Sequence, residues 1–192
     1  VVLLAALAVR ATSAGPAFYH QTRLGLNGRR FTIWKLRSMY HNCEAQSGIR
    51  WATRGDSRVT PVGKFIRATH IDELPQLWNV LKGEMSLVGP RPERPEICKE
   101  LARHVPRYYD RVRVKPGVTG LAQVLLPADT DLPGVRRKVA TDLIYLDRAG
   151  LWLDVRLLVA TGLKVVHVPP AVRQRLLGLP HPAAAEPAAV AA

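Results

Sequence analysis

One stretch of the chain, residues 64–92, constrains its fold more than any other, because two carboxylates stand at the head of a helical pattern. Apolar residues recur there at helical spacing: Leu74, Leu77, Trp78 and Leu81. This spacing predicts a helix with one apolar stripe, the side that such helices normally bury. Asp72 suits the N-cap, Pro75 is tolerated in the first turn, and Gly83 suits the end of the helix.

The start of this predicted helix places Asp72 and Glu73 where phosphate chemistry is favoured. Free N–H groups and the helix dipole attract phosphate there. Two adjacent carboxylates can hold Mg2+ together with substrate phosphates, and a carboxylate can also attack phosphorus. Arg91 follows closely in sequence and can clamp phosphate oxygens. From these residues alone, an ordinary helix cap remains the alternative interpretation.

Four blocks of sequence in the same order resemble one protein family. The blocks are GPAFYHQTRLGLNGRRFTIWKLRSM, KFIRATHIDELPQLWNVLKGEMSLVGPRP, RVRVKPGVTGLAQV and DTDLPGVRRKVATDLIYLDRAGLWLDVRLL. They are similar to the bacterial sugar transferase family, the monotopic polyprenyl-phosphate phosphoglycosyltransferases. The resemblance implies an α/β fold: a helix-rich compact catalytic domain with a small antiparallel sheet. It also implies an N-terminal membrane-associated helix of the re-entrant type and amphipathic helices at the membrane interface.

The activity that the resemblance implies is transfer of a phosphosugar from a nucleotide-diphosphate sugar, a UDP-sugar, to undecaprenyl phosphate. The reaction would pass through an aspartyl-phosphosugar on Asp72, release UMP and initiate a surface polysaccharide. Mg2+ would be the cofactor, with Asp72 and Glu73 as its ligands. The implied location is the cytoplasmic face of the bacterial inner membrane, and a homodimer is left open.

Further site residues follow from matching the family's motifs position by position. The resemblance implies a substrate phosphate-binding set: Lys35, Arg67, Arg91 and Arg113. Arg37 is a weaker candidate of the same kind. Lys35 has a structural alternative, a charged residue that blunts a strand edge. His70 stands where the family often has Ser and is assigned no role.

The charge of the chain indicates an anionic partner. It carries 28 Lys and Arg against 15 Asp and Glu, a formal net charge of +13. Nucleotide-sugar phosphates and an anionic membrane face fit, and the sequence shows no motif of a specific nucleic-acid binder. Two other functions stay open: a catalytically silent membrane scaffold and a basic nucleic-acid-binding module.

Three segments are predicted along the chain. Residues 1–14 begin with nine apolar residues, about half of what a membrane-spanning helix needs. The resemblance implies that they are the last part of a longer membrane-associated segment, which would make the chain N-terminally truncated; an ordinary buried helix is the alternative. Residues 15–168 form the catalytic domain. Residues 169–192 form a Pro/Ala-rich, disordered tail.

Within the catalytic domain, patterning predicts a hairpin and several helices. The expected strands are Ala17–Gln21 and Arg30–Lys35, joined by a turn at Leu26–Gly28. The expected helices are residues 94–109, broken at Pro106 near its end, 135–148 and 151–166, with loops at residues 40–58 and 125–134. The last helix is mostly apolar with Trp152 and flanking charges, so it belongs either to the core or to a membrane interface.

Overall fold

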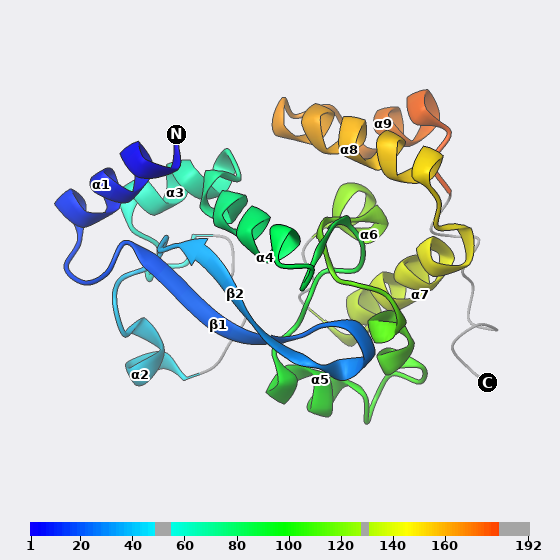
Figure 1. Ribbon diagram of the computed structural model, residues 1–192, viewed down its shortest axis with the longest axis horizontal. Helices are drawn as coiled ribbons and strands as arrows, with labels where there is room; N and C mark the ends of the chain where they lie inside the picture. Colours follow the sequence, from blue (N-terminus) through cyan, green and yellow to red (C-terminus); the bar gives the residue numbers. More distant parts are fainter. Residues whose placement is uncertain (49–54, 128–130, 181–192) are drawn as a thin grey trace. The chain divides into compact units, whose positions relative to one another are not determined.

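The structure, a computed structural model, describes residues 1–48, 55–127 and 131–180. The chain divides into two compact units, where the sequence favoured one domain. The first unit comprises Val1–Gln21 and Thr32–Asn79, and the second comprises Thr22–Phe31 and the chain from Val80 onward. Helices dominate both units, and the strands form two small sheets (Figure 1). The helix-rich α/β class is therefore confirmed.

A hairpin contributes residues to both units. β1 (Phe18–Leu24) pairs with β2 (Arg30–Leu36) in a two-stranded sheet, and the short 3-10 turn η1 (Leu26–Gly28) joins them. Asn27 adopts a left-handed conformation at φ 54°, which Asn tolerates better than most residues. The predicted hairpin is confirmed, with β1 extending three residues beyond its predicted end.

The first unit packs short helices around a small core. Its helices are α1 (Val2–Thr12), α2 (Cys43–Ser47), α3 (Pro61–Ala68), the 3-10 helix η2 (Ile71–Gln76) and the start of α4 (Leu77–Leu81). The core contains Ala6 and Val9 of α1, Leu36 of β2 and Ile66 of α3. Thr60 caps α3 by accepting a hydrogen bond from the Gly63 nitrogen at 2.9 Å. The sequence did not predict α3 or α2, which lies within the expected loop; residues 49–54 of that loop lie outside the described residues.

The second unit contains a parallel pair of strands. β3 (Ser86–Val88) pairs with β4 (Gly117–Thr119) in parallel, with Ser86 opposite Gly117. The connection between them holds α5 (Pro95–Leu101) and the 3-10 helix η3 (Tyr108–Arg113). A parallel pair needs such a long crossover. The sequence did not predict this parallel pair, and the helix predicted over residues 94–109 with a break at Pro106 is two shorter elements.

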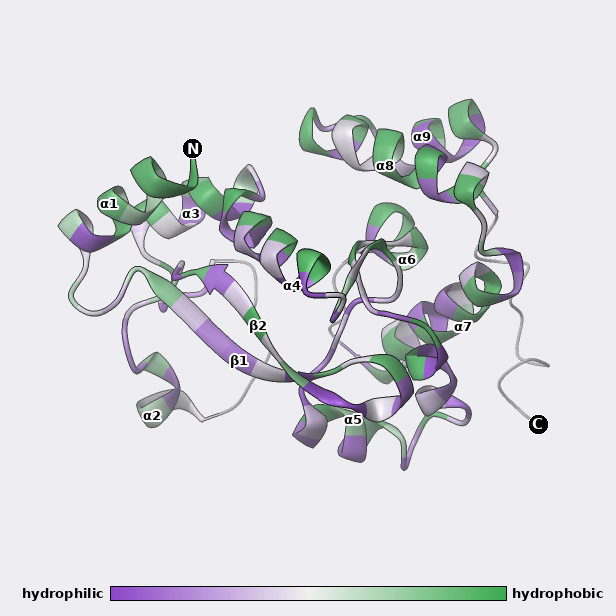
Figure 2. Ribbon diagram, in the orientation of Figure 1, coloured by the Kyte–Doolittle hydropathy of each residue, from purple (hydrophilic) through white to green (hydrophobic). Residues whose placement is uncertain are grey.

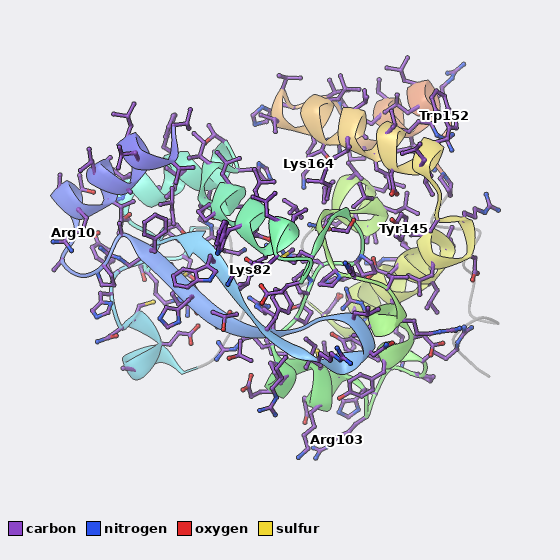
Figure 3. All side chains as sticks on the ribbon, in the orientation of Figure 1. Arg10, Lys82, Arg103, Tyr145, Trp152 and Lys164 are labelled. Atoms are coloured by element: carbon purple, nitrogen blue, oxygen red, sulfur yellow. The ribbon has the colours of Figure 1, made fainter. Side chains whose placement is uncertain are left out.

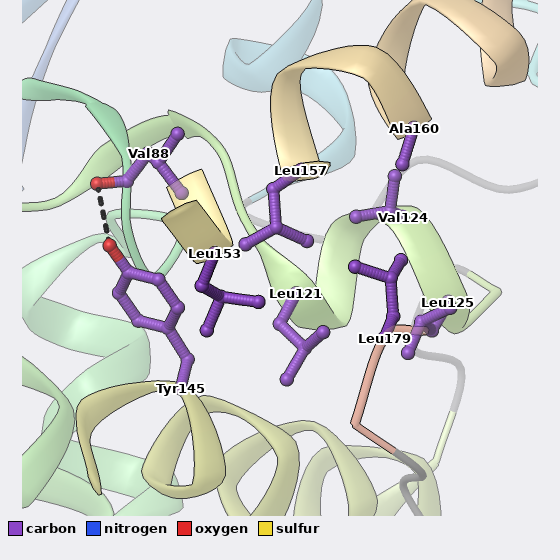
Figure 4. Close-up of a cluster of buried hydrophobic side chains, with 9 residues drawn as sticks. All are labelled: Val88, Leu121, Val124, Leu125, Tyr145, Leu153, Leu157, Ala160 and Leu179. Carbon is purple, nitrogen blue, oxygen red and sulfur yellow. Dashed lines mark hydrogen bonds between the residues drawn. The ribbon is translucent and has the colours of Figure 1, made fainter. Parts of the chain in front are cut away.

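Two hydrophobic clusters stabilise the second unit. One unites α6 (Leu121–Leu125) with α7 (Leu132–Arg148) and α8 (Leu151–Val165), as Figure 4 shows. Within it the Tyr145 hydroxyl donates to Asp154 at 2.9 Å and lies 3.4 Å from the Val88 carbonyl oxygen, and burial raises the pKa of Tyr145. The second cluster lies under α5, η3 and α7 and includes Cys98, where burial raises the pKa of the thiol.

The predicted disordered tail is wrong in its first part. α9 (Pro170–Leu177) packs against α8, and Leu179 joins the core that α6 and α8 share. The Arg173 side chain, 4% exposed, donates to the Val124 carbonyl at 2.7 Å. This buried contact anchors a helix that composition alone did not reveal. Residues 181–192, the remainder of the predicted tail, lie outside the described residues.

Candidate active site

The segment that carries the two carboxylates is amphipathic in the opposite sense from the prediction. Its apolar residues Leu77, Trp78 and Leu81 are 42%, 56% and 79% exposed. Its polar residues face inward instead: Asp72, Gln76 and Asn79 are buried. The apolar stripe was correctly recognised, but it lies on the outer surface. The polar residues recur at helical spacing too, and this second stripe is the sequence signal that was missed.

The carboxylates lie in a 3-10 turn and not at an α-helical cap. η2 begins at Ile71, and its capping position is His70, whose side chain makes no capping hydrogen bond. His70 adopts a left-handed backbone conformation at φ 56°. The prediction of Asp72 as N-cap is therefore wrong: Asp72 is the second residue of η2 and is 8% exposed. The left-handed residue and Pro75 tighten the segment into a 3-10 turn, which α4 continues from Leu77.

Asn79 fixes this segment against strand β2. Its side-chain amide is fully buried. The amide oxygen accepts a hydrogen bond from the backbone nitrogen of Trp34 at 3.3 Å, and the amide nitrogen donates to the backbone carbonyl of Thr32 at 2.7 Å. The side chain thus pairs with alternate residues of β2 as a neighbouring strand would. The contact sets η2 and α4 in register with the strand that carries Lys35.

Lys35 and Glu73 meet in this register. The Lys35 ammonium lies 2.7 Å from Oε1 of Glu73, and the two side chains are 16% and 12% exposed. Such an ion pair, largely removed from solvent, holds one carboxylate of the dyad beside a fixed positive charge. This ion pair favours the interpretation of Lys35 as a site residue over its interpretation as an edge-blunting lysine. Its role in binding phosphate stays a prediction.

Two further arginines of the first unit, Arg67 and Arg37, make different contacts. Arg67 is half-buried in α3, the helix that contacts η2, and its carbonyl accepts from the His70 nitrogen at 3.3 Å. Arg37 instead donates to the carbonyls of Ser13, Gly15 and Pro16, at 3.0, 3.1 and 2.6 Å. Burial and the charge of Arg10 lower its pKa. Arg37 therefore stabilises the turn after α1, and its role in binding phosphate stays a prediction.

The second unit holds Arg91 on a rigid backbone segment. Every carbonyl from Pro90 to Glu93 accepts a hydrogen bond. The Pro90 carbonyl accepts from Gly117 N at 3.0 Å, and the Arg91 carbonyl accepts from Arg111 Nη2 at 3.0 Å. The Pro92 carbonyl accepts from Arg23 Nη1 at 3.1 Å, and the Glu93 carbonyl accepts from Leu24 N at 3.0 Å. Four consecutive fixed carbonyls leave this backbone little freedom. The side chain of Arg91 therefore projects from a fixed point, as a phosphate clamp requires.

Close backbone contact explains the glycines around this segment. A Cβ atom at Gly117 would overlap the Gly89 nitrogen, and one at Gly120 would overlap the Gly89 carbonyl oxygen. The segment Lys115–Gly120, which contains β4, therefore packs directly on the backbone that leads to Arg91. Gly-Pro-Arg-Pro at the end of the second sequence block and Pro-Gly-Val-Thr-Gly in the third block therefore contact each other.

A buried charge network supports the same segment. The Arg111 guanidinium lies 2.7 Å from Asp142, and the two side chains are 4% and 2% exposed. Glu93 pairs with Lys138 at 2.7 Å and with Arg23 at 3.3 Å. Burial alone would raise the pKa of Glu93, but the charges of Lys138, Arg111 and Arg23 outweigh it and lower the pKa to about 2.

The lowered pKa of Glu93 predicts a stability effect that depends on pH. Its ordinary value is 4.5, so the ionised network stabilises the fold above about pH 4.5 and loses this contribution as the pH falls towards 2. Glu93→Gln should cost about 3 kcal/mol of unfolding free energy at pH 7 and much less at pH 3. Urea titrations at both pH values measure the difference. Glu96→Gln, whose side chain is 63% exposed, is the control; an equal cost at both pH values would contradict the assignment.

Arg113 lies in a different environment from Arg91. It is exposed and lines a pocket of about 190 Å3, together with Arg107, Val114, Leu143, Leu146 and Asp147. Arg107 is engaged there by Asp110 at 2.8 Å. Arg91 and Arg113 both belong to the second unit, whereas Lys35, Arg67, Asp72 and Glu73 belong to the first. The phosphate-binding roles of all four basic residues stay predictions.

The donor set suits Mg2+ only in company with a substrate. Among the described residues, no three acidic, histidine or cysteine side chains gather as metal ligands. Mg2+ binds readily through one or two carboxylates when water and substrate phosphates complete its shell. Asp72 and Glu73 fit this mode, and they do not form a cage for the metal alone.

Comparison with known proteins identifies the family. Residues 1–168 match the family described as "Bacterial sugar transferase". The chain is 45% identical over 163 residues to a UDP-glucose:undecaprenyl-phosphate glucose-1-phosphate transferase of Caulobacter vibrioides, covering 84% of this chain and 61% of the relative. It is 44% identical over 161 residues to a UDP-N-acetylgalactosamine-undecaprenyl-phosphate N-acetylgalactosaminephosphotransferase of Aeromonas hydrophila, covering 84% of this chain and 38% of the relative.

A third relative has a more comparable length. This is the exopolysaccharide production protein PSS of Rhizobium leguminosarum bv. phaseoli, 38% identical over 171 residues, with 83% of this chain and 82% of the relative covered. The chain thus spans 61% and 38% of the first two relatives and most of the third. The family match over residues 1–168 includes the dyad, the Gly-Pro-Arg-Pro segment and the helices α7 and α8. The chain belongs to the bacterial sugar transferase family.

Proposed function

We propose that this chain is a phosphoglycosyltransferase that transfers a sugar 1-phosphate from a UDP-sugar to polyprenyl phosphate. The observation that carries the proposal is the dyad: buried Asp72 stands beside Glu73, whose carboxylate is fixed by Lys35 at 2.7 Å. Membership of the sugar transferase family and the activities for which two relatives are named support the same reaction.

In the proposed mechanism an Asp72 carboxylate oxygen attacks the phosphorus that bears the sugar. The bond from this phosphorus to UMP breaks, UMP leaves, and a phosphosugar remains on Asp72. A phosphate oxygen of the lipid then attacks the same phosphorus, and the bond to Asp72 breaks with return of the carboxylate. Splitting the transfer into two steps lets a soluble donor and a lipid acceptor use one site in turn.

The remaining site residues stabilise the negative charge of the phosphoryl groups or hold a carboxylate in place. Lys35 holds Glu73 in place, and Arg91 clamps phosphoryl oxygens from its fixed backbone. Asp72 and Glu73 would hold Mg2+, which would supply positive charge to neutralise the diphosphate of the donor. Arg67 and Arg113 complete the proposed set of phosphate-binding residues.

The test is a reaction without the lipid acceptor. The chain is incubated with Mg2+ and either UDP-glucose or UDP-N-acetylgalactosamine, the donors named in two relatives. At most one UMP per protein should be released, and intact mass should rise by one phosphosugar. Release of UDP would indicate ordinary glycosyl transfer. Absence of nucleotide release together with salt-dependent retention on DNA would favour the nucleic-acid-binding alternative.

We further propose that each unit contacts the cytoplasmic face of a membrane through an exposed apolar surface. In the first unit, Leu3, Leu4 and Leu7 of α1 are 73%, 72% and 58% exposed. In the second, Leu151, Trp152 and Val159 of α8 are 83%, 72% and 49% exposed. Both helices are largely apolar in Figure 2, and Trp152 and Lys164 mark the two ends of α8 in Figure 3. None of the helices in the described ranges is long and apolar enough to cross a bilayer.

Membrane contact predicts the effect of a single substitution on α8. The chain should bind anionic vesicles, and part of that binding should weaken with salt because the net charge is +13. Trp152→Ser should weaken binding about tenfold, because a large apolar side chain no longer inserts. Co-sedimentation at 0.1 and 1 M salt measures both parts. Leu132→Ser, on α7, is the control: if it lowered binding as much as Trp152→Ser, the assignment to α8 would be wrong.

A further inference from the structure

The side chain of Gln76 is a buried amide with an unused donor. Gln76 is 2% exposed, and its Nε2 finds no hydrogen-bond acceptor among the residues that the structure describes. An unpaired buried donor destabilises a folded protein, so native proteins contain few of them. A donor of this kind is explained when a bound molecule supplies the acceptor.

Gln76 shares one short helix with the proposed nucleophile. Asp72 and Gln76 are the two buried residues of η2. Glu73 precedes Gln76 by three residues, a separation that eclipses side chains in a 3-10 helix. One short helix therefore carries both carboxylates and the unused donor.

Asn79 shows how the same segment treats a buried amide with a structural role. Both ends of the Asn79 side chain are paired, with the Trp34 nitrogen and the Thr32 carbonyl. Gln76 is almost as deeply buried, yet its Nε2 has no such partner in the described part of the chain. The contrast indicates that the Gln76 amide is not used to hold the fold.

We propose that Gln76 is a further substrate-contacting residue, whose Nε2 donates a hydrogen bond to a phosphoryl oxygen of the group transferred at Asp72. The inference rests on the proposed function, since that function places a phosphoryl group at η2. An amide nitrogen only donates, so its ligand must present an acceptor, and phosphoryl oxygens are strong acceptors. A fixed donor in a site that excludes water stabilises negative charge as it develops on these oxygens.

Gln76→Met separates this role from a structural one. Methionine keeps the length of the side chain and removes the unpaired polar group, so the melting temperature should stay equal or rise. The rate of adduct formation at saturating UDP-sugar should fall about 10- to 100-fold, the loss expected for a hydrogen bond to a charged group. Gln76→Glu keeps the shape but replaces the donor with a carboxylate, and its rate should fall at least as far.

Asn79→Leu is the matched control for stability. It should lower the melting temperature, because it leaves the Trp34 nitrogen and the Thr32 carbonyl unpaired. Unchanged rates in Gln76→Met and Gln76→Glu would overturn the inference. A rate loss in Gln76→Met that accompanies a fall in melting temperature as large as that of Asn79→Leu would also overturn it.

Asp72→Asn in the same assay tests the proposed function separately. If Asp72→Asn forms no adduct while Gln76→Met reacts at the rate of the parent chain, only the role of Gln76 is lost. An adduct that still forms in Asp72→Asn removes the phosphoryl group from Asp72, and the proposed function fails with the inference built on it.

Discussion

Asp72→Asn should abolish both UMP release and formation of the phosphosugar adduct. An amide is a poor nucleophile and a poorer ligand for Mg2+ than a carboxylate, so the first step of the proposed mechanism has no attacking group. Intact-mass spectrometry after incubation with UDP-sugar and Mg2+ measures the adduct, and nucleotide analysis measures UMP. The melting temperature should change little, because Asp72 caps no helix in this fold.

Glu73→Gln should behave differently from Asp72→Asn. It keeps the attacking carboxylate but loses the ion pair with Lys35, so turnover should slow while some adduct still forms. Asp110→Asn is a matched control, since it removes a carboxylate from a half-exposed ion pair with Arg107. An adduct in Asp72→Asn that disappears in Glu73→Gln would reverse the roles of the two residues.

Arg111→Met should be the most destabilising single change in the second unit. It removes the ion-pair partner of Asp142, which is 2% exposed, and the donor to the Arg91 carbonyl. Breaking a buried ion pair from one side costs about 3–5 kcal/mol. Urea unfolding of the single variant measures this cost.

The double variant Arg111→Met with Asp142→Leu tests the physical reason. Replacing both charges by apolar side chains should recover much of the lost stability, because no buried charge then lacks a partner. Arg107→Met is the surface control: its pair with Asp110 is partly exposed and should contribute at most about 1 kcal/mol. Equal costs for Arg107→Met and Arg111→Met would show that burial of the Arg111 pair has no energetic importance.

Patterning in the sequence predicted elements better than it predicted their faces. The hairpin turn at Leu26–Gly28 and the apolar periodicity of α7, with Val139 and Leu143 buried, are local signals and were confirmed. The stripe through Leu77 and Trp78 was also real, but periodicity alone does not say which side of a helix meets the core. An apolar surface that faces outward reverses the usual rule.

Tertiary contacts account for what the sequence could not reveal. α9 depends on Arg173 reaching the Val124 carbonyl from 49 residues away, and no local pattern encodes that contact. The resemblance selected Lys35 and Glu73 one by one, but their contact depends on how Asn79 sets η2 against β2. Gln76 was missed because the expected helix would have placed it in solvent.

The amide of Asn79 has a consequence for association between copies of this chain. A two-stranded ribbon has two open edges, and an open edge can recruit a strand from another molecule. On β2, the Trp34 nitrogen and the Thr32 carbonyl are groups that an incoming strand would need, and Asn79 already occupies both. The residue that sets the register of the dyad thus also closes this part of the ribbon to sheet extension.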